Sequence, residues 1–223
     1  MLVGRELERG TAAVLWTQSV TPARWLATTL AAPAALIVAG LTPLTVLSRS
    51  AWAGSRDFLN TEWYEDGVFA STGLLPVAYA FLGLALGALA ALLTRSSLKG
   101  TAGAVAALFA VSTVVGRYRV SLWPTVTDTG TKALNVPPQA QELTHGAVTS
   151  DGARIANDWA CVDSDHPADI RRCMDRSGLS DFWATYHPAS HYWPLQLAES
   201  FTVLTMAAAA TAAAFWLLKR RTA

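Results

Sequence analysis

The stretch GVFASTGLLPVAYAFLGLALGALAALLT, residues Gly67–Thr94, decides how this chain folds, because it contains no charged side chain. Three further stretches share that property: Trp25–Ser48, Gly100–Gly116 and Ser200–Leu218. A helix needs roughly 20 apolar residues to cross the hydrocarbon core of a bilayer, so Gly100–Gly116 is marginal and the others are long enough. In lipid, only a helix satisfies its own backbone hydrogen bonds over such a length. The sequence therefore predicts an all-α membrane protein with about four transmembrane helices.

The composition supports lipid, rather than water, as the solvent of these stretches. Of the 223 residues, 52% are hydrophobic and 15% are charged, whereas a soluble domain carries about 25% charged residues. The sequence has no basic patch with interleaved aromatic residues, so nucleic-acid binding is not indicated. It also lacks a phosphate-binding loop, so the chain is not expected to bind and hydrolyse ATP by that route.

The distribution of charge predicts the orientation. If the amino terminus lies in the cytoplasm and the four stretches alternate, every acid except Glu6, Glu8 and Glu199 falls outside, and most basic residues of the short loops fall inside. The positive-inside rule then places both termini in the cytoplasm, with Arg117 and Arg119 as exceptions. The expected organisation is a cytoplasmic interfacial helix (1–24), three transmembrane helices with short loops (25–116), an extracytoplasmic segment between spans three and four (117–192), the last transmembrane helix (193–218) and a cytoplasmic tail (219–223).

The two cysteines, Cys161 and Cys173, both lie in the segment assigned to the outside. An even number of cysteines in an oxidising compartment favours a disulfide bond. Closing a loop of this size would add about 3 kcal/mol in the chain-entropy model. The alternative is two free thiols in an irregular loop. Given the orientation, the sequence predicts the disulfide.

Residues suited to catalysis or metal binding form no recognisable motif. His187 and His191 are four residues apart, but Pro188 disfavours a helix through His187, and no glutamate stands at the general-base position of an H-E-x-x-H motif. No G-x-S-x-G nucleophile motif is present. We therefore expect no enzyme activity, no cofactor and no metal site, and we expect the histidines at surface or interfacial positions.

Glu199 is the one acid near the outer end of a predicted span. Placing an ionisable group at membrane depth costs free energy, so such a group suggests a functional role by default. A hydrated position at the interface, near Trp193 and Gln196, is the favoured interpretation. In the other interpretation Glu199 faces the helix bundle, and its partner is Arg117 or Arg119, which are expected at the same level.

Two motifs resemble those of a known family. The first is Arg5-Glu6-Leu7-Glu8-Arg9-Gly10-Thr11, followed by WTQSVT at 16–21 and RWL at 24–26. The second is HPASHYWPLQ at 187–196, followed by Glu199. In their order and spacing, and in the long segment between spans three and four, they resemble actinobacterial ABC-2 type transporter permeases over nearly the whole chain.

The resemblance implies a permease subunit of an ABC exporter, which forms the translocation pathway and binds no nucleotide itself. Its partners would be a separate ABC ATPase subunit and a second permease subunit, in a homo- or heterodimer within the bilayer. The residues implied to contact the ATPase are Glu6, Glu8, Arg9, Gly10 and Thr11. The same charged segment could be a plain interfacial anchor.

Two departures from the family pattern are visible. Family members typically have two further spans before the first motif, so the chain is expected to lack them. His191 stands where the family tends to have arginine, so an ion pair there would become pH-dependent or be lost. A hypothesis from another functional class is a non-transporting membrane protein with an extracytoplasmic sensing or assembly domain. It accounts equally well for the four spans and the cysteine pair, but not for the resemblance at residues 5–11.

Overall fold

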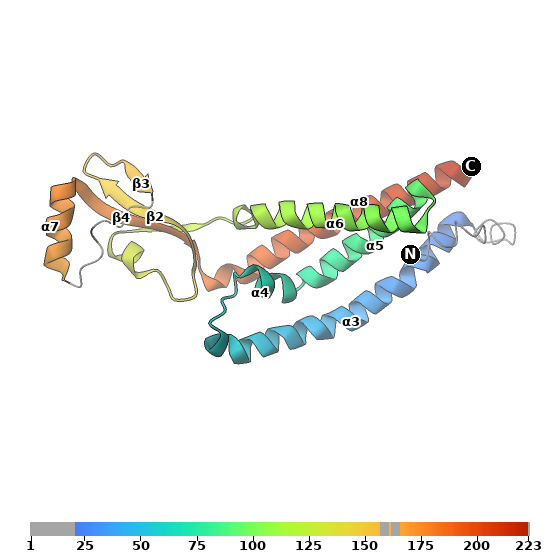
Figure 1. The fold of residues 1–223 in the computed structure, drawn as a ribbon, viewed down its shortest axis with the longest axis horizontal. Helices are drawn as coiled ribbons and strands as arrows, with labels where there is room; N and C mark the ends of the chain where they lie inside the picture. Colours follow the sequence, from blue (N-terminus) through green and yellow to red (C-terminus); the bar gives the residue numbers. More distant parts are fainter. Residues whose placement is uncertain (1–20, 157–160, 162–165, 223) are drawn as a thin grey trace. The chain divides into compact units, whose positions relative to one another are not determined.

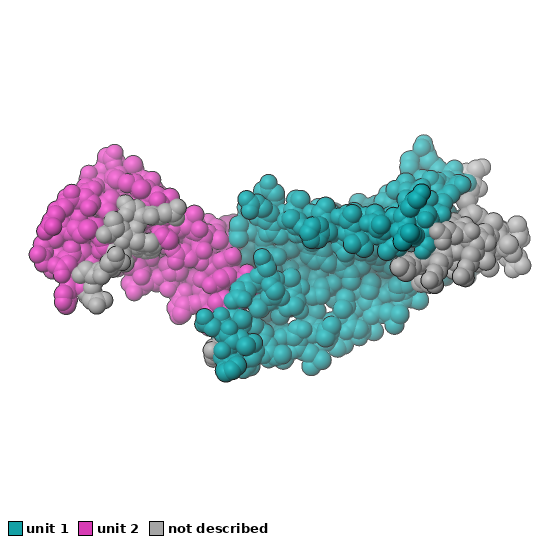
Figure 2. Space-filling view, viewed as in Figure 1, with its two compact units in different colours: residues 1–61, 65–122, 195–223 teal, residues 62–64, 123–194 magenta. Residues whose placement is uncertain are grey.

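The computed structural model describes residues 21–156, 161 and 166–222 (Figure 1). The chain divides into two compact units, coloured separately in Figure 2. The helical unit comprises Met1–Thr61, Glu65–Leu122 and Leu195–Ala223, and the sheet unit comprises Glu62–Tyr64 and Trp123–Pro194. The predicted coupling residues Glu6, Glu8, Arg9, Gly10 and Thr11 lie outside the described residues.

Four long helices form from the four apolar stretches: α3 (Pro22–Leu59), α5 (Leu75–Thr94), α6 (Ser97–Tyr118) and α8 (Tyr192–Thr222). Each forms all or most of a helical segment long and apolar enough to cross a membrane. These segments are Pro22–Arg56, Leu75–Thr94, Ser97–Ser121 and Ala189–Arg221. The prediction of four candidate transmembrane helices is therefore confirmed. The third helix extends beyond Gly100–Gly116 at both ends, which removes the doubt about its length.

The composition of Gly67–Thr94 alone suggested one continuous helix, but this stretch does not form one. It contains the short helix α4 (Asp66–Ser71) and then α5, with a break between them. Gly73 in the break has a φ of 72°, a conformation that glycine adopts at little cost. Pro76 follows in the first turn of α5, where its missing N–H is harmless.

Local signals set the other helix ends. The Thr21 side chain caps α3 by accepting a hydrogen bond of 3.3 Å from the Arg24 N–H, and Pro22 occupies the first turn. The turn between α5 and α6 contains Arg95 in the left-handed conformation, with a φ of 50°. This short turn makes α5 and α6 an antiparallel hairpin. A Cβ atom added at Gly100 of α6 would lie 3.0 Å from the Ala91 Cα of α5, so glycine lets the two backbones approach closely.

α5 is the central helix of the helical unit. One buried cluster joins it to α3 and α8 and contains Trp25, Leu26, Ala88, Ala91, Leu92, Ala214 and Leu218. A second joins it to α6 and α8 and contains Ala78, Leu82, Ala85, Val115, Val203, Ala207 and Ala210. α3 is peripheral: 6% of its most apolar segment is buried within the chain, against 33% for α5.

The sheet unit corrects the all-α prediction for the long polar segment. It contains β1 (Val126–Thr129), the 3-10 helix η2 (Gly130–Asn135), β2 (Gln141–Thr149), β3 (Arg154–Ala156), α7 (Pro167–Ser177), β4 (Leu179–His187) and the 3-10 turn η3 (Ala189–His191). The strands form one antiparallel sheet in the order β1-β4-β2-β3. Ala147 of β2 pairs with Ile155 of β3 and with Phe182 of β4. The remaining 3-10 turn, η1 (Arg119–Ser121), follows α6 in the helical unit.

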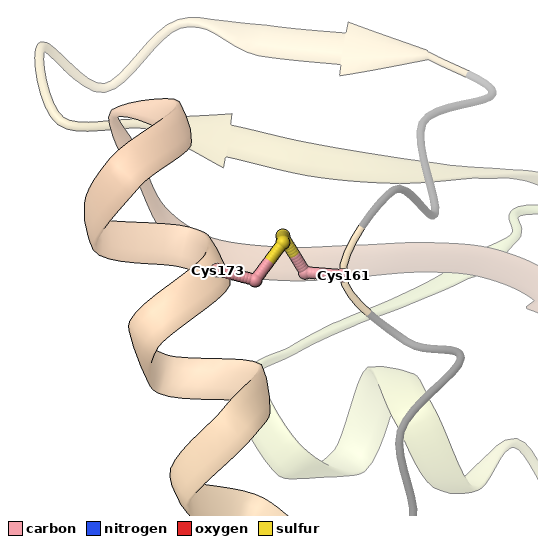
Figure 3. The surroundings of a disulfide bond; sticks show 2 residues. All are labelled: Cys161 and Cys173. Carbon is pink, nitrogen blue, oxygen red and sulfur yellow. A yellow bond between two sulfur atoms is a disulfide. The ribbon is translucent and has the colours of Figure 1, made fainter.

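One face of this sheet carries a small apolar core. Its buried members are Ala133, Ala147, Cys161, Leu179, Phe182 and Ala184, and Ile170, Cys173 and Met174 pack against them. The predicted disulfide between Cys161 and Cys173 is present and ties α7 to the segment before it (Figure 3). The two Cα atoms are 5.5 Å apart, within the usual range for a disulfide. The bond therefore fastens α7 to the sheet unit's own core.

Candidate functional site

A carboxylate is buried inside the helical unit. Glu199 of α8 is fully buried, with a relative exposure of 0%. Its Oε2 accepts a hydrogen bond of 2.8 Å from Arg119 Nε, and its Oε1 accepts one of 3.0 Å from the Tyr79 hydroxyl. The favoured sequence interpretation, a hydrated position at the interface, is therefore wrong. Glu199 faces the bundle and pairs with Arg119, as the other interpretation stated.

The topology of the helices explains how these three residues meet. Tyr79 lies near the start of α5, and Arg119 directly follows the last residue of α6. Because α5 and α6 are antiparallel neighbours, these two positions lie at the same end of the hairpin. Glu199 lies two turns into α8 and comes to this same end. We call it the α4 end of the helical unit, because α4 lies there too.

Arg119 links the buried carboxylate to α4. Its Nη1 donates a hydrogen bond of 2.9 Å to Asp66 Oδ1, and its guanidinium carbon lies 4.3 Å from the centroid of the Phe69 ring. The Asp66 side chain is 96% exposed, whereas those of Arg119 and Glu199 are 12% and 1% exposed. An exposed ion pair contributes about 0–1 kcal/mol. The pair with Glu199 therefore dominates the electrostatics of the site.

Gln196 fastens the end of α4 from the same face of α8. It is fully buried, and its Nε2 donates to the backbone oxygens of Phe69 at 2.7 Å and of Thr72 at 3.1 Å. These carbonyls lie at the end of α4, where helices leave acceptors without intrahelical partners. Gln196 Oε1 and Ser200 Oγ are buried and have no hydrogen-bond partner within the described parts of the chain. Gln196, Glu199 and Ser200 thus form a buried polar patch on one face of α8.

We call the set Asp66, Tyr79, Arg119, Gln196 and Glu199 the polar cluster. It joins α4, α5, α8 and the end of α6. Burying two charges carries a desolvation cost that their attraction offsets only when the hydrogen bonds are also satisfied. Here both carboxylate oxygens have donors. Removing one partner would leave a buried charge without compensation, so the cluster constrains how these elements can be arranged.

The remaining predicted residues do not belong to the polar cluster. Arg117 is exposed and forms no ion pair with any residue that the structure describes. His191 lies in the sheet unit, where its Nδ1 is 2.9 Å from His187 Nδ1 and the ring centroids are 5.2 Å apart. One ring must donate and the other accept. His187 is fully buried, so of the two positions expected for the histidines, surface or interfacial, the surface one does not apply to it.

Sequence reasoning missed three members of the polar cluster: Asp66, Tyr79 and Gln196. A signal for two of them was present, because Tyr79 and Gln196 are polar side chains in or beside apolar stretches, where an unpaired polar group is costly. Asp66 carried no such signal, since it begins a short helix among other acids. Across the described residues, no group of three or more His, Cys, Asp or Glu side chains is placed to hold a metal ion.

The comparison with protein families identifies the helical part of the chain. The sequence model of the family described as ABC-2 membrane transporter related matches residues 2–119, which is more than half of the 223 residues. The chain belongs to this family. The match runs from the charged amino-terminal motif to Arg119 of the polar cluster. No significant match was found among curated proteins or among solved structures.

An ABC-2 related chain with four apolar helices is a membrane-embedded protein of the transporter permease type. Permeases of this type normally work with an ATPase partner and do not themselves catalyse a reaction. Within the helical unit, the ion pair and hydrogen bonds of the polar cluster connect α4, α5, α8 and the end of α6.

Proposed function

We propose that this chain is a permease subunit of an ABC-type exporter, which forms the translocation pathway and is driven by a separate ATPase subunit. The observation that carries the proposal is the family match over residues 2–119, together with four helices able to cross a membrane. The ATPase would supply nucleotide binding and hydrolysis, and a second permease subunit, identical or different, would complete the pathway.

In this proposal the amino-terminal charged motif is the contact with the ATPase. Glu6, Glu8, Arg9, Gly10 and Thr11 are the contact candidates, as the resemblance implies. Ten residues (12–21) separate the motif from the first residue of α3, so α3 is the first described helix on which a partner's movement at the motif would act. Nucleotide binding would then shift the population between two arrangements of the spans.

The polar cluster has a defined role in such a switch. It ties α4 to α5, α8 and the end of α6 through hydrogen bonds that the Arg119, Gln196 and Tyr79 side chains donate. A group of elements fastened by a buried ion pair moves as one body, because separating the charges is costly. We infer that these elements form the rigid part against which α3 moves. This agrees with the small buried share of α3.

The proposed orientation places both termini in the cytoplasm and the sheet unit outside. The disulfide between Cys161 and Cys173 supports it, since such bonds persist in oxidising compartments and are rare in the cytosol.

Co-purification with the ATPase tests the proposal. The candidate partner is an ATPase whose gene lies next to this one. Charge reversal in Glu6→Lys/Glu8→Lys should abolish the retention of that ATPase while leaving the amount of permease unchanged. The matched control is Glu142→Lys/Asp175→Lys, which reverses two exposed acids of the sheet unit and should leave retention unchanged. Equal retention by wild type and both variants would contradict the assigned contact.

A non-transporting sensing or assembly protein is the second candidate. The specific observation in its favour is the sheet unit, which has its own core and disulfide. One simple observation separates the two candidates. An ATPase gene next to this one favours the exporter. The lack of such a gene, with no ATPase retained on purification, favours the alternative.

A further inference from the structure

An apolar groove lies within the helical unit, between α3, α5 and α8. It has a volume of about 620 Å³, and its walls include Ala31, Ala34, Phe81, Leu84, Ala208 and Phe215. α3 contacts the other helices near its start, through the buried side chains of Trp25 and Leu26. Farther along it runs apart from them (Figure 1) and exposes large side chains such as Leu36, at 73%. The groove occupies the space that this separation leaves.

The chemistry of the groove limits what can occupy it. Thr211 is the one polar side chain among its described lining residues, and its Oγ1 already donates a hydrogen bond of 2.8 Å to the Ala207 backbone oxygen. A polar ligand would therefore lose its hydration without gaining hydrogen bonds from these walls, which is costly. The groove also lies between three candidate membrane spans. Hydrocarbon from the surrounding bilayer is the occupant that both facts favour.

The groove leads toward a basic helix end. A second cavity, of about 450 Å³, shares Phe215 with the groove and is lined also by Thr21, Trp216 and Lys219. Tryptophan and lysine at the end of a membrane helix occupy the level of the lipid headgroups, and basic pockets between such helices bind anionic headgroups. Lys219 is the basic side chain that lines this cavity, whereas the Arg220 guanidinium stacks on Trp216 and Arg221 donates to the Leu92 backbone oxygen. An apolar groove that ends beside basic residues matches the two parts of an anionic lipid.

We propose that the helical unit binds one anionic phospholipid of the bilayer, with an acyl chain in the groove and the phosphate beside Lys219. The groove selects hydrocarbon by its lack of free polar groups, and Lys219 selects the negative headgroup by charge. A single basic side chain near the membrane surface favours an anionic lipid by about fivefold in binding constant. The proposal does not depend on the ATPase contact, so it can fail or hold independently of the exporter assignment.

The test uses the full chain in phosphatidylcholine nanodiscs that contain a phosphatidylglycerol with a diazirine in its acyl chain. After irradiation, labelled peptides are mapped by mass spectrometry. The expected result is labelling concentrated on the groove walls of α3, α5 and α8. Unlabelled phosphatidylglycerol should compete about fivefold better than phosphatidylcholine. The reference surface is the lipid-exposed part of α6 around Phe109, which is 73% exposed. The proposal would be overturned if the groove were labelled no more strongly than this surface, or if the two lipids competed equally.

Matched variants separate the groove from the headgroup site. Ala208→Phe fills the groove and should reduce labelling of its α3 wall at least fivefold, whereas Ala209→Phe adds the same side chain at a neighbouring position that does not line the groove. Lys219→Gln should abolish the preference for phosphatidylglycerol, whereas Arg220→Gln, whose guanidinium stacks on Trp216, should leave most of it. Should Ala208→Phe fail to elute as a single species, Ala34→Phe fills the groove from the α3 wall. Unchanged labelling in a folded groove variant would contradict the proposal.

Discussion

Removal of the Arg119 side chain should destabilise the protein far more than removal of the neighbouring Arg117. In Arg119→Ala the carboxylate of Glu199 loses its charged partner while its side chain is only 1% exposed. Leaving one member of a buried ion pair uncompensated costs about 3–5 kcal/mol. For a chain of this size, about 1 kcal/mol shifts the melting temperature by about 2–4 °C. The expected decrease is therefore about 6–20 °C.

The exposed contacts of the same site provide the internal comparison. Asp66→Asn removes a partner whose side chain is 96% exposed, so its expected cost is below about 1 kcal/mol. Arg117→Ala removes an exposed side chain and should change stability by no more than about 0.5 kcal/mol. The order of effects, with Arg119→Ala much the largest, is the quantity that the structure determines.

Thermal unfolding in detergent, followed by tryptophan fluorescence, measures these effects, because the chain has nine tryptophans. A double variant, Arg119→Met/Glu199→Gln, removes both charges and keeps an acceptor for the Tyr79 hydroxyl. It should regain most of the stability lost in Arg119→Ala, because replacing a buried pair as a whole is often close to neutral. Additive losses in the double variant, or equal losses in Arg117→Ala and Arg119→Ala, would refute the reasoning.

Three further predictions concern the sheet unit. Cys161 and Cys173 are 12 residues apart, and replacing both by serine should destabilise the sheet unit by about 3 kcal/mol in the chain-entropy model. The loss is measured as faster proteolysis within residues 123–194, and unchanged proteolysis would argue against a structural role for the disulfide. Gly146→Ala should disrupt the pairing of β2 with β3, because the added Cβ would lie 1.8 Å from a backbone oxygen of β3. Amide hydrogen exchange of these two strands measures the pairing, and slower exchange in the variant would contradict the prediction. The pKa of Tyr186 is raised by its hydrogen bond to the Asp128 carboxylate and by burial. The stability that this interaction contributes is therefore present below the ordinary tyrosine pKa of about 10 and is lost as the pH rises through the folded-state pKa. The stability difference between wild type and Tyr186→Phe should shrink above about pH 10, and a difference that grows there would show the sign to be wrong.

The membrane helices could be predicted because their signal is local. A long run without charge specifies a helix in lipid, and the start of α3 is marked by Thr21 and Pro22, which act within one turn. The break before α5 was marked too, by Gly73 and Pro76. It was missed because apolar composition is the same on either side of it, and composition was the criterion that defined the stretch.

The sheet could not be predicted with the same criterion. The outer strands β1 and β3 have four and three residues, too few for an alternation to stand out from a polar segment with many turns. β2 and β4 have nine residues each, but burial in β4 does not alternate, since Phe182, Trp183 and Ala184 are all buried. The disulfide was predictable, because two cysteines in one segment leave a single intramolecular pairing. The burial of Glu199 depends on where α5 and α6 place Tyr79 and Arg119, which is a tertiary property. Sequence could supply the candidate partners but not choose between hydration and pairing.

The central claim is that the four apolar helices cross the bilayer and leave the sheet unit on the side opposite to the turn between α5 and α6. Labelling of single introduced cysteines in intact cells with a membrane-impermeant maleimide tests it most directly, because the native cysteines are in a disulfide and do not react. Ser150→Cys in the sheet unit should be labelled without permeabilisation, and Ser96→Cys between α5 and α6 should be labelled only after it. Equal labelling of both positions in intact cells, or of neither, would contradict the account.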